Sequence, residues 1–262
     1  MVWRNACYVI RDARAVLARG PQCRALASST VALAVAGLCV APLGAQGGGN
    51  PPRGWRPDMD VERAPWIWLF DGKNLDKWKG YKSDAVPAGW RIADGTLTKD
   101  RPVADIVTRD EFGDFELYLE WKIGEAGNAG IFYRGTEEYP RVYWSAPEYQ
   151  LLDDAKALDG RSRLTSAGAA YGLYESPAGH LKPVGEWNET RIIAKGGHVE
   201  HWLNGVKLLE YELWGPDWEA RVAASKFKDW PNYGRARRGR IALQGDHAGA
   251  LSFRKIRVRE LP

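Results

Sequence analysis

Residues 185–211, which read GEWNETRIIAKGGHVEHWLNGVKLLEY, constrain the fold more than any other part of this chain. Segments 191–194, 198–203 and 206–211 have the alternating or apolar pattern that is typical of short strands. Gly196-Gly197 and Asn204-Gly205 separate these segments, and Asn-Gly tolerates the positive φ angles of a tight hairpin turn. The stretch therefore predicts three antiparallel strands, which is the local pattern of a β-sandwich and not of an α/β enzyme.

Further short segments of the same kind run through the chain. They cover residues 66–71, 90–98 with a turn at Asp94-Gly95, 115–123, 129–134, 148–152, 240–243 and 251–258. The one helical candidate is 216–227, where Pro216 suits the first turn. Without a βαβ period, this pattern predicts an all-β protein, with two antiparallel sheets packed as a sandwich.

The first 45 residues differ in composition from the rest. They carry five arginines against one acid, Asp12, then the apolar run 26–40 and small residues up to Ala45. This order predicts a signal peptide at 1–45. A membrane anchor is the alternative, but the apolar run is shorter than the roughly 20 residues of a spanning helix. We therefore predict an exported protein, periplasmic or extracellular, with no stable membrane anchor after cleavage, a Gly/Pro-rich linker at 46–64 and a domain at 65–262.

Removal of this leader changes the charge and the cysteine content. The chain has 37 Lys+Arg and 33 Asp+Glu, and 32 of each lie after Ala45. The mature protein is formally neutral, which argues against nucleic acid as a partner. Cys7, Cys23 and Cys39 all lie in the leader, so the domain has no disulfide.

Tryptophan is unusually frequent, with 13 in the chain and 12 of them after the leader. Core packing accounts for several of them. Because Trp and Tyr also stack on the apolar faces of sugar rings, this number in a neutral exported domain favours a carbohydrate ligand.

Polar residues that could carry chemistry fall on predicted strands and their flanking loops. Glu148 and Gln150 share one face of a strand, while Tyr149 points to the core. A carboxylate beside an amide can orient sugar hydroxyls or take a proton, although a solvated strand face explains the same pattern. Arg134 offers a planar fork for oxygen atoms, or a weak surface ion pair.

The loop after residue 243 is a second candidate. Gln244 precedes a glycine-rich turn that holds His247, and an imidazole titrates near neutral pH. A single loop histidine is more often incidental than catalytic. Lys226 and Tyr171 complete the candidates, and the sequence lacks GxSxG, phosphate-loop, HExxH and CxxC motifs.

These segments together resemble the 3-keto-disaccharide hydrolase domain family. The matching segments, in order, are 68–75 with Trp78, 89–90, 94–97, 115–121, 128–134, 148–154, 185–188 with 201–205, and 240–249 ending in 253–256. The resemblance implies a concanavalin A-like jelly-roll β-sandwich that cleaves glycosides whose sugar is oxidised at C3.

The resemblance also implies roles for individual residues. Glu148 and His247 are its acid/base candidates, and the enolate would be stabilised by Arg134, Lys226 or a bound cation. The residues that would hold sugar hydroxyls are Gln150, Asp153, Tyr171, His201 and Gln244, and Trp187 lies with His201 at a possible edge of the site. Acidic side chains near loops could bind a divalent cation such as Ca²⁺, but no loop has a recognisable ligand spacing, so the sequence leaves a metal requirement open.

Two other functions fit the same residues. A lectin-like module would bind sugar without turnover, because one fold serves many functions. An ordinary glycosidase would use two carboxylates on an unoxidised glycoside. In every case the expected partner is an oligosaccharide or a glycoside.

Overall fold

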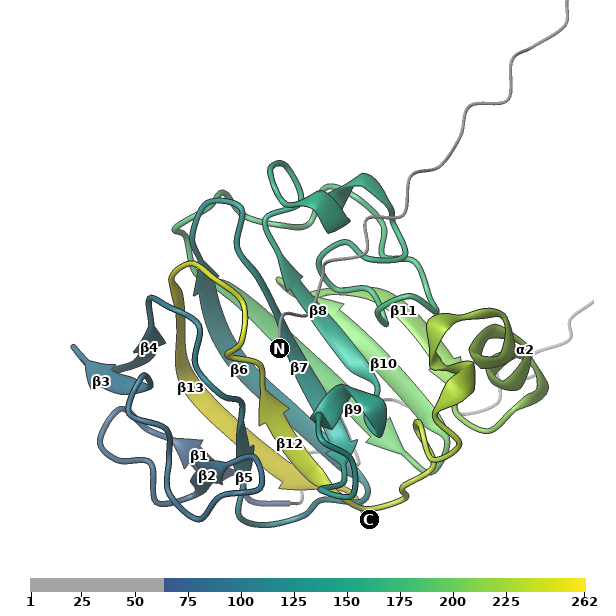
Figure 1. The fold of residues 1–262 in the computed structure, drawn as a ribbon, viewed down its shortest axis with the longest axis horizontal. Coiled ribbons are helices and arrows are strands. Elements are labelled where there is room, and N and C mark those ends of the chain that lie inside the picture. Colours follow the sequence, from purple (N-terminus) through teal and green to yellow (C-terminus); the bar gives the residue numbers. More distant parts are fainter. Residues whose placement is uncertain (1–63) are drawn as a thin grey trace, which may run out of the picture. The chain divides into compact units, whose positions relative to one another are not determined.

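Two antiparallel sheets form a β-sandwich in the computed structural model, which describes residues 64–262 (Figure 1). The predicted signal peptide and the linker up to residue 63 lie outside the described residues. Among those described, no helix is both long and apolar enough to cross a membrane.

The larger sheet has eight strands in the order β11-β10-β9-β6-β13-β4-β3, and β1 also pairs with β13. Their bounds are β1 Ile67–Phe70, β3 Arg91–Ala93, β4 Thr96–Lys99, β6 Phe115–Ile123, β9 Asn188–Lys195, β10 His198–Leu203, β11 Val206–Glu212 and β13 Leu251–Glu260.

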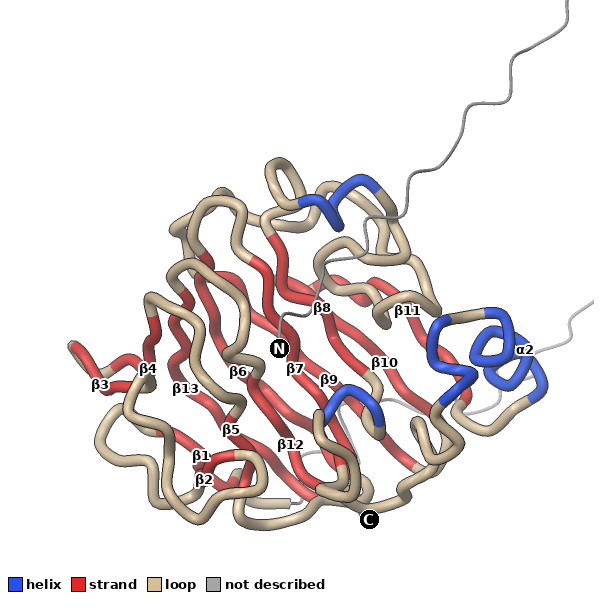
Figure 2. The backbone as a smooth tube through the Cα atoms, viewed as in Figure 1, coloured by secondary structure: helices blue, strands red, loops and turns tan. Residues whose placement is uncertain are grey.

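The smaller sheet has five strands in the order β2-β5-β12-β7-β8. They are β2 Trp78–Gly80, β5 Ile106–Thr108, β7 Asn128–Gly135, β8 Glu148–Leu152 and β12 Arg240–Leu243. Helices are few within residues 64–262 and lie at the margins of the sheets, as Figure 2 shows in blue. They are α2 Pro216–Ala224 and the 3-10 helices η1 Val142–Trp144, η2 Leu158–Arg161 and η3 Lys226–Asp229. The predicted sandwich with one short α-helix is confirmed, although α2 ends before the predicted boundary at 227.

The hydrophobic core lies between the sheets and follows the two-residue period of the strands. On β6, Phe115, Leu117 and Trp121 are all fully buried in this core. Glu116, on the opposite face, is also buried, because Arg191 and Arg259 contact its carboxylate. The alternation predicted for this strand is therefore correct, and charged side chains cover its outer face.

The predicted three-strand unit is present as β9, β10 and β11, paired in sequence order. Asn204 and Gly205 join β10 to β11 with φ angles of 49° and 82°. Two successive positive φ angles define the type I′ hairpin turn that the Asn-Gly pair predicts.

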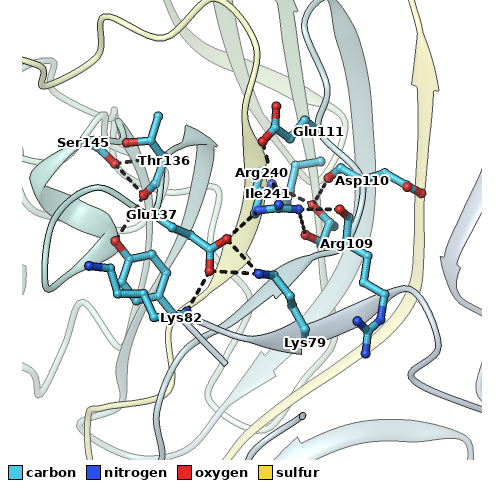
Figure 3. Close-up of polar contacts among 12 residues, drawn as sticks. Lys79, Lys82, Arg109, Asp110, Glu111, Thr136, Glu137, Ser145, Arg240 and Ile241 are labelled. Carbon is cyan, nitrogen blue, oxygen red and sulfur yellow. Dashed lines mark hydrogen bonds and ion pairs between the residues drawn. The ribbon is translucent and has the colours of Figure 1, made fainter. Parts of the chain in front are cut away.

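A network of ion pairs fills one end of the outer face of the smaller sheet (Figure 3). Glu137 accepts hydrogen bonds from Lys79 Nζ at 2.8 Å and from Arg240 Nε at 3.0 Å. It also accepts one from the backbone N–H of Lys82 at 2.7 Å. The network attaches the segment after β7 to β2 and β12. Its carboxylate and cations satisfy one another, and the opposite end of β12 leads into the loop that begins at Gln244.

Candidate active site

A pocket of about 230 Å³ lies at that opposite end, on the outer face of the smaller sheet. Its walls come from β7, β8, the loop after β12, η1, η2, η3 and Tyr171. The lining residues are Asn128, Tyr143, Glu148, Asp159, Tyr171, Lys226, Phe227, Gln244, Asp246 and His247. The structure thus brings together Glu148, Tyr171, Lys226, Gln244 and His247, which the sequence analysis selected from four separate segments.

Glu148 is the first residue of β8, and only 9% of it is exposed. Its carboxylate lies over Gly130 on the neighbouring strand β7, where a Cβ would come within 2.2 Å of Oε1. Burial raises the pKa of Glu148 to about 8, against the opposing effect of Lys226. At neutral pH the carboxyl is mainly protonated and has a proton to donate.

Lys226 begins η3, and a column of parallel aromatic rings anchors this short helix to the sandwich. Phe227 stacks on Tyr233 at 4.1 Å, Tyr233 on Trp218 at 5.8 Å, and Trp218 on Tyr211 at 5.5 Å. Tyr211 lies on β11, so the column connects the pocket wall to the larger sheet.

This anchoring fixes the ammonium group of Lys226 inside the pocket. Its Nζ lies 4.3 Å from the ring centre of Tyr171, a cation–π contact. Burial lowers the pKa of Lys226, while Glu148 and Asp159 act in the opposite direction. The pocket therefore contains a cation that faces two carboxyl groups and can stabilise a developing negative charge.

A polar group next to β7 and β8 includes the lining residues Asn128 and Asp159. Asp159 Oδ2 accepts hydrogen bonds from Asn128 Nδ2 at 3.1 Å and from the Tyr171 hydroxyl at 3.2 Å. Gln150 Nε2 donates to Asn128 Oδ1 at 3.3 Å. Gln150 Oε1 and Gln244 Oε1 are buried and find no hydrogen-bond partner within residues 64–262. Such amide oxygens can accept hydrogen bonds from sugar hydroxyls.

The loop after β12 supplies the third wall with Gln244, Asp246 and His247. Gln244 is bonded through its backbone N–H to Gly130 O at 3.0 Å, which keeps the loop close to β7. His247 Nε2 lies 3.9 Å from Asp246 Oδ1, and the imidazole is partly exposed. An exposed imidazole beside a carboxylate can exchange protons with a ligand and with solvent.

Five residues selected from the sequence do not line this pocket. Gln150 is fully buried and bonds to the lining residue Asn128, and two others, Arg134 and His201, are core residues. The guanidinium of Arg134 donates to Gly113 O at 2.9 Å and to Gly196 O at 2.8 Å. It also pairs with Asp114 at 3.1 Å. His201 is fully buried between the sheets, and burial lowers its pKa to about 4. Both side chains are used in joining parts of the sandwich.

The other two are structural in a different way. Asp153 is buried, and its carboxylate accepts the backbone N–H groups of Ala126 at 2.8 Å and Ala155 at 3.1 Å. Trp187 lies beneath Arg254, whose guanidinium carbon is 4.1 Å from its ring centre. Asp153 thus stabilises a turn, and Trp187 takes part in a cation–π contact.

Five lining residues were not among the sequence candidates: Asn128, Tyr143, Asp159, Phe227 and Asp246. Asn128 and Asp246 are close in sequence to selected residues, so the sequence contained a signal for them. Asp159 lies on η2 and Tyr143 on η1, two 3-10 helices that have no clear period to mark them.

One group among the described residues has the composition of a metal site. Atoms of His198, Glu200 and Glu210 lie within 4.8 Å of one another, on β10 and β11. Lys207 Nζ lies 2.6 Å from Glu210 Oε2 and 3.7 Å from Glu200 Oε1, so an ammonium group already pairs with both carboxylates. The residues are a possible metal-binding group outside the pocket, and no step of the chemistry depends on them.

The arrangement in the pocket is suited to acid/base chemistry. A mainly protonated buried carboxyl, a confined ammonium group and an imidazole line one small pocket. Proton transfer by such groups and electrostatic stabilisation of an oxyanion are the two main contributions that they make to catalysis.

Comparison with known proteins shows the family of the chain. Residues 65–259 match the model of the family described as 3-keto-alpha-glucoside-1,2-lyase-like domain. A 3-keto-disaccharide hydrolase of Bacteroides thetaiotaomicron is 34% identical over 235 residues, which cover 78% of this chain and 81% of that protein.

Solved structures give the same result. A crystal structure from Parabacteroides distasonis, provisionally described as a glycosyl hydrolase, is 31% identical with a TM-score of 0.69, covering 75% of this chain and 94% of that one. A second structure from this organism, with the same provisional description, is 28% identical with a TM-score of 0.59, covering 75% and 100%. The resemblance that the sequence indicated is confirmed, and the chain belongs to the 3-keto-alpha-glucoside-1,2-lyase-like domain family.

Proposed function

We propose that this protein cleaves the glycosidic bond of 3-keto-glycosides, including 3-keto-disaccharides, by elimination followed by hydration. The observation that carries the proposal is the buried Glu148, with a pKa of about 8, in the same pocket as Lys226 and His247. The family membership supports the same substrate class.

Cleavage of a 3-keto-glycoside by elimination requires a base, an acid and a group that stabilises an enolate. A ketone at C3 acidifies the proton at C2, and a base removes that proton to give an enolate. The C1–O bond then breaks as the C1=C2 double bond forms, and the leaving oxygen takes up a proton. Addition of water returns a proton to C2 and a hydroxyl to C1, so the net reaction is hydrolysis.

Each step has a candidate residue in the pocket. His247 removes the C2 proton, and the Lys226 ammonium stabilises the enolate oxygen. Glu148, which carries a proton at neutral pH, donates it to the leaving oxygen. The resulting carboxylate then takes a proton from the water that adds to C1, and the protonated His247, after exchange with solvent, returns a proton to C2. Gln244 and Asn128 hold sugar hydroxyls.

The size of the pocket fits one sugar ring. At about 230 Å³ it is smaller than the roughly 300–1,000 Å³ of pockets for drug-sized ligands. Tyr143 and Phe227 supply aromatic surface to its walls. We place the oxidised ring inside the pocket, with the leaving group directed outward.

The experiment is incubation of the protein with a 3-keto-disaccharide and with its unoxidised parent. We expect release of 3-keto-glucose from the first only, and loss of this activity in Glu148→Ala. Sugar binding that survives Glu148→Ala and His247→Ala, without turnover by the wild type, would establish a lectin-like module instead. Cleavage of the unoxidised parent would establish an ordinary glycosidase.

A further inference from the structure

A buried lysine lies next to the loop after β12. Lys99 ends β4, and only 1% of it is exposed. No carboxylate of residues 64–262 lies within ion-pair distance of its Nζ. Instead, the ammonium donates to His247 O at 2.6 Å and to Gly249 O at 3.2 Å. A buried cation is unfavourable unless its hydrogen bonds are satisfied, so these carbonyl groups are held strongly.

A buried carboxyl holds the other end of the same loop. Asp105 precedes β5 and is 5% exposed, and its Oδ1 accepts the backbone N–H of Gly245 at 2.8 Å. The backbone carbonyl of Gly245 accepts the N–H of Val103 at 3.0 Å. Gly245 therefore forms hydrogen bonds through both its backbone N–H and its carbonyl.

Close packing at Gly245 makes this attachment rigid. A Cβ at Gly245 would lie 2.6 Å from Val103 O and 3.1 Å from Ala104 O, so the two backbones touch. Asp246 lies between Gly245 and the carbonyl of His247. The two side chains that this segment directs to the pocket are thus fixed on one side by Asp105 and on the other by Lys99.

We propose that Lys99 and Asp105 form a buried clamp that positions His247 and Asp246 for proton transfer. Lys99 does not line the pocket and acts through the backbone of His247, so it is a positioning residue. The proposal rests on the function assigned to His247 above. A small displacement of a reacting group is costly in rate, whereas binding of the sugar depends on the other walls of the pocket.

The test compares Lys99→Met with Leu97→Met in the full chain. Methionine keeps the apolar stem at position 99 but removes the ammonium group. Leu97 lies on the same strand, is fully buried in the core and bonds nothing in the loop, so it controls for a disturbed strand. Per folded molecule, we expect kcat for the 3-keto-disaccharide to fall on the order of 10–100-fold in Lys99→Met, with KM nearly unchanged. Leu97→Met should keep its kcat.

A second measurement does not depend on activity. The ring ¹⁵N signals of His247, identified by their loss in His247→Asn, should shift in Lys99→Met and stay in place in Leu97→Met. Wild-type kcat together with wild-type His247 signals in Lys99→Met would overturn the clamp. If the wild type cleaves no 3-keto-glycoside, the proposed function fails, while the ¹⁵N signals still decide the clamp.

The Asp105 side provides an independent comparison, which also serves if Lys99→Met does not fold. Asp105→Asn keeps an oxygen that accepts the Gly245 N–H, and Asp105→Leu removes it. We expect near-normal kcat and His247 signals in the first, and reduced kcat with shifted signals in the second. Equal behaviour of the two variants would contradict the clamp.

Discussion

At the scale of single residues, burial distinguishes Glu148 and Gln150 from ordinary polar residues on a solvated strand face. The alternating pattern at Glu148 and Gln150 correctly predicts that the two share a face, but a solvated face explained that pattern equally well. In the structure both are buried, because Gly130 on the adjacent strand leaves room for the carboxylate. Which strand lies beside β8 depends on non-local pairing, which the local sequence does not show.

The same limit explains the two core residues selected from the sequence. Arg134 and His201 have side chains suited to a sugar site, and the structure uses both to join segments of the sandwich. Residue type and strand position are local properties. The groups that surround a side chain come from distant parts of the chain.

The raised pKa of Glu148 predicts a specific dependence of stability on pH. The pKa is about 8 in the folded protein and 4.5 as the reference for an unfolded chain. The folded state favours the protonated carboxyl. The contribution of Glu148 to the free energy of unfolding is therefore fully present below pH 4.5 and is lost as the pH rises from there through 8. Since one pKa unit corresponds to about 1.4 kcal/mol, the loss amounts to a few kcal/mol.

Glu148→Gln cannot ionise and should escape this loss. Urea unfolding of the wild type and of the variant at pH 5 and at pH 9 measures this loss of free energy of unfolding. We expect the free energy of unfolding of the wild type to fall more steeply between these two values. Parallel pH dependence of the two proteins would show that Glu148 does not ionise with a raised pKa.

At the scale of elements, strands with strong local signals were predictable. β6, β8, β10 and β12 have the bounds that their patterns predict, and the Asn204-Gly205 turn adopts the expected φ angles. The three-residue strand β5 and the 3-10 helices were not predicted as elements. Such short segments take their structure from packing, and they carry Asp159 and Tyr143 to the pocket.

Close approach between two strands yields a prediction at this scale. Gly130→Ala introduces a Cβ 2.2 Å from Glu148 Oε1, so the carboxylate must move. We expect kcat to fall on the order of 100-fold while the protein still folds, because displacement of a reacting group by about 1 Å has an effect of that size. Steady-state kinetics with a 3-keto-disaccharide, beside a thermal unfolding curve, measures both.

Gly113→Ala is the matched control. Its Cβ would meet no atom closer than 3.6 Å, and the residue lies outside the pocket. The control should keep its kcat. Full activity in Gly130→Ala would mean that the position of the Glu148 carboxylate does not limit the reaction.

At the scale of the whole molecule, the fold places a polar pocket on the outer face of one sheet, while the interior is mainly apolar and contains a few hydrogen-bonded polar side chains such as His201. The larger sheet provides more of the core than the smaller one, and the smaller one provides the strands that carry Glu148 and Asn128. The class of fold was predictable, since it follows from many short strands with tight turns. The convergence of β7, β8, η3 and the loop after β12 was not, because it depends on the pairing order of the strands.

The composition of the first 45 residues makes a prediction about the whole chain in a cell. We propose that they direct export and are removed after Ala45, since a basic segment, an apolar run and small residues follow in that order. Expression of the full chain in a Gram-negative host should give periplasmic protein that begins at Gln46. Fractionation and N-terminal sequencing measure this, with a variant lacking residues 1–45 as the cytoplasmic control. Membrane-bound protein that retains Met1 would contradict the proposal.

The central claim is that the glycosidic bond breaks by way of proton removal at C2. The most direct test is to run the reaction in D₂O and to examine C2 of the released 3-keto sugar by NMR and mass spectrometry. Isolated 3-keto sugar incubated with Glu148→Gln in D₂O controls for spontaneous exchange. Elimination followed by hydration predicts one solvent deuterium at C2 in every product molecule formed. Product that retains its original C2 hydrogen would contradict the account, because direct displacement at C1 never breaks that bond.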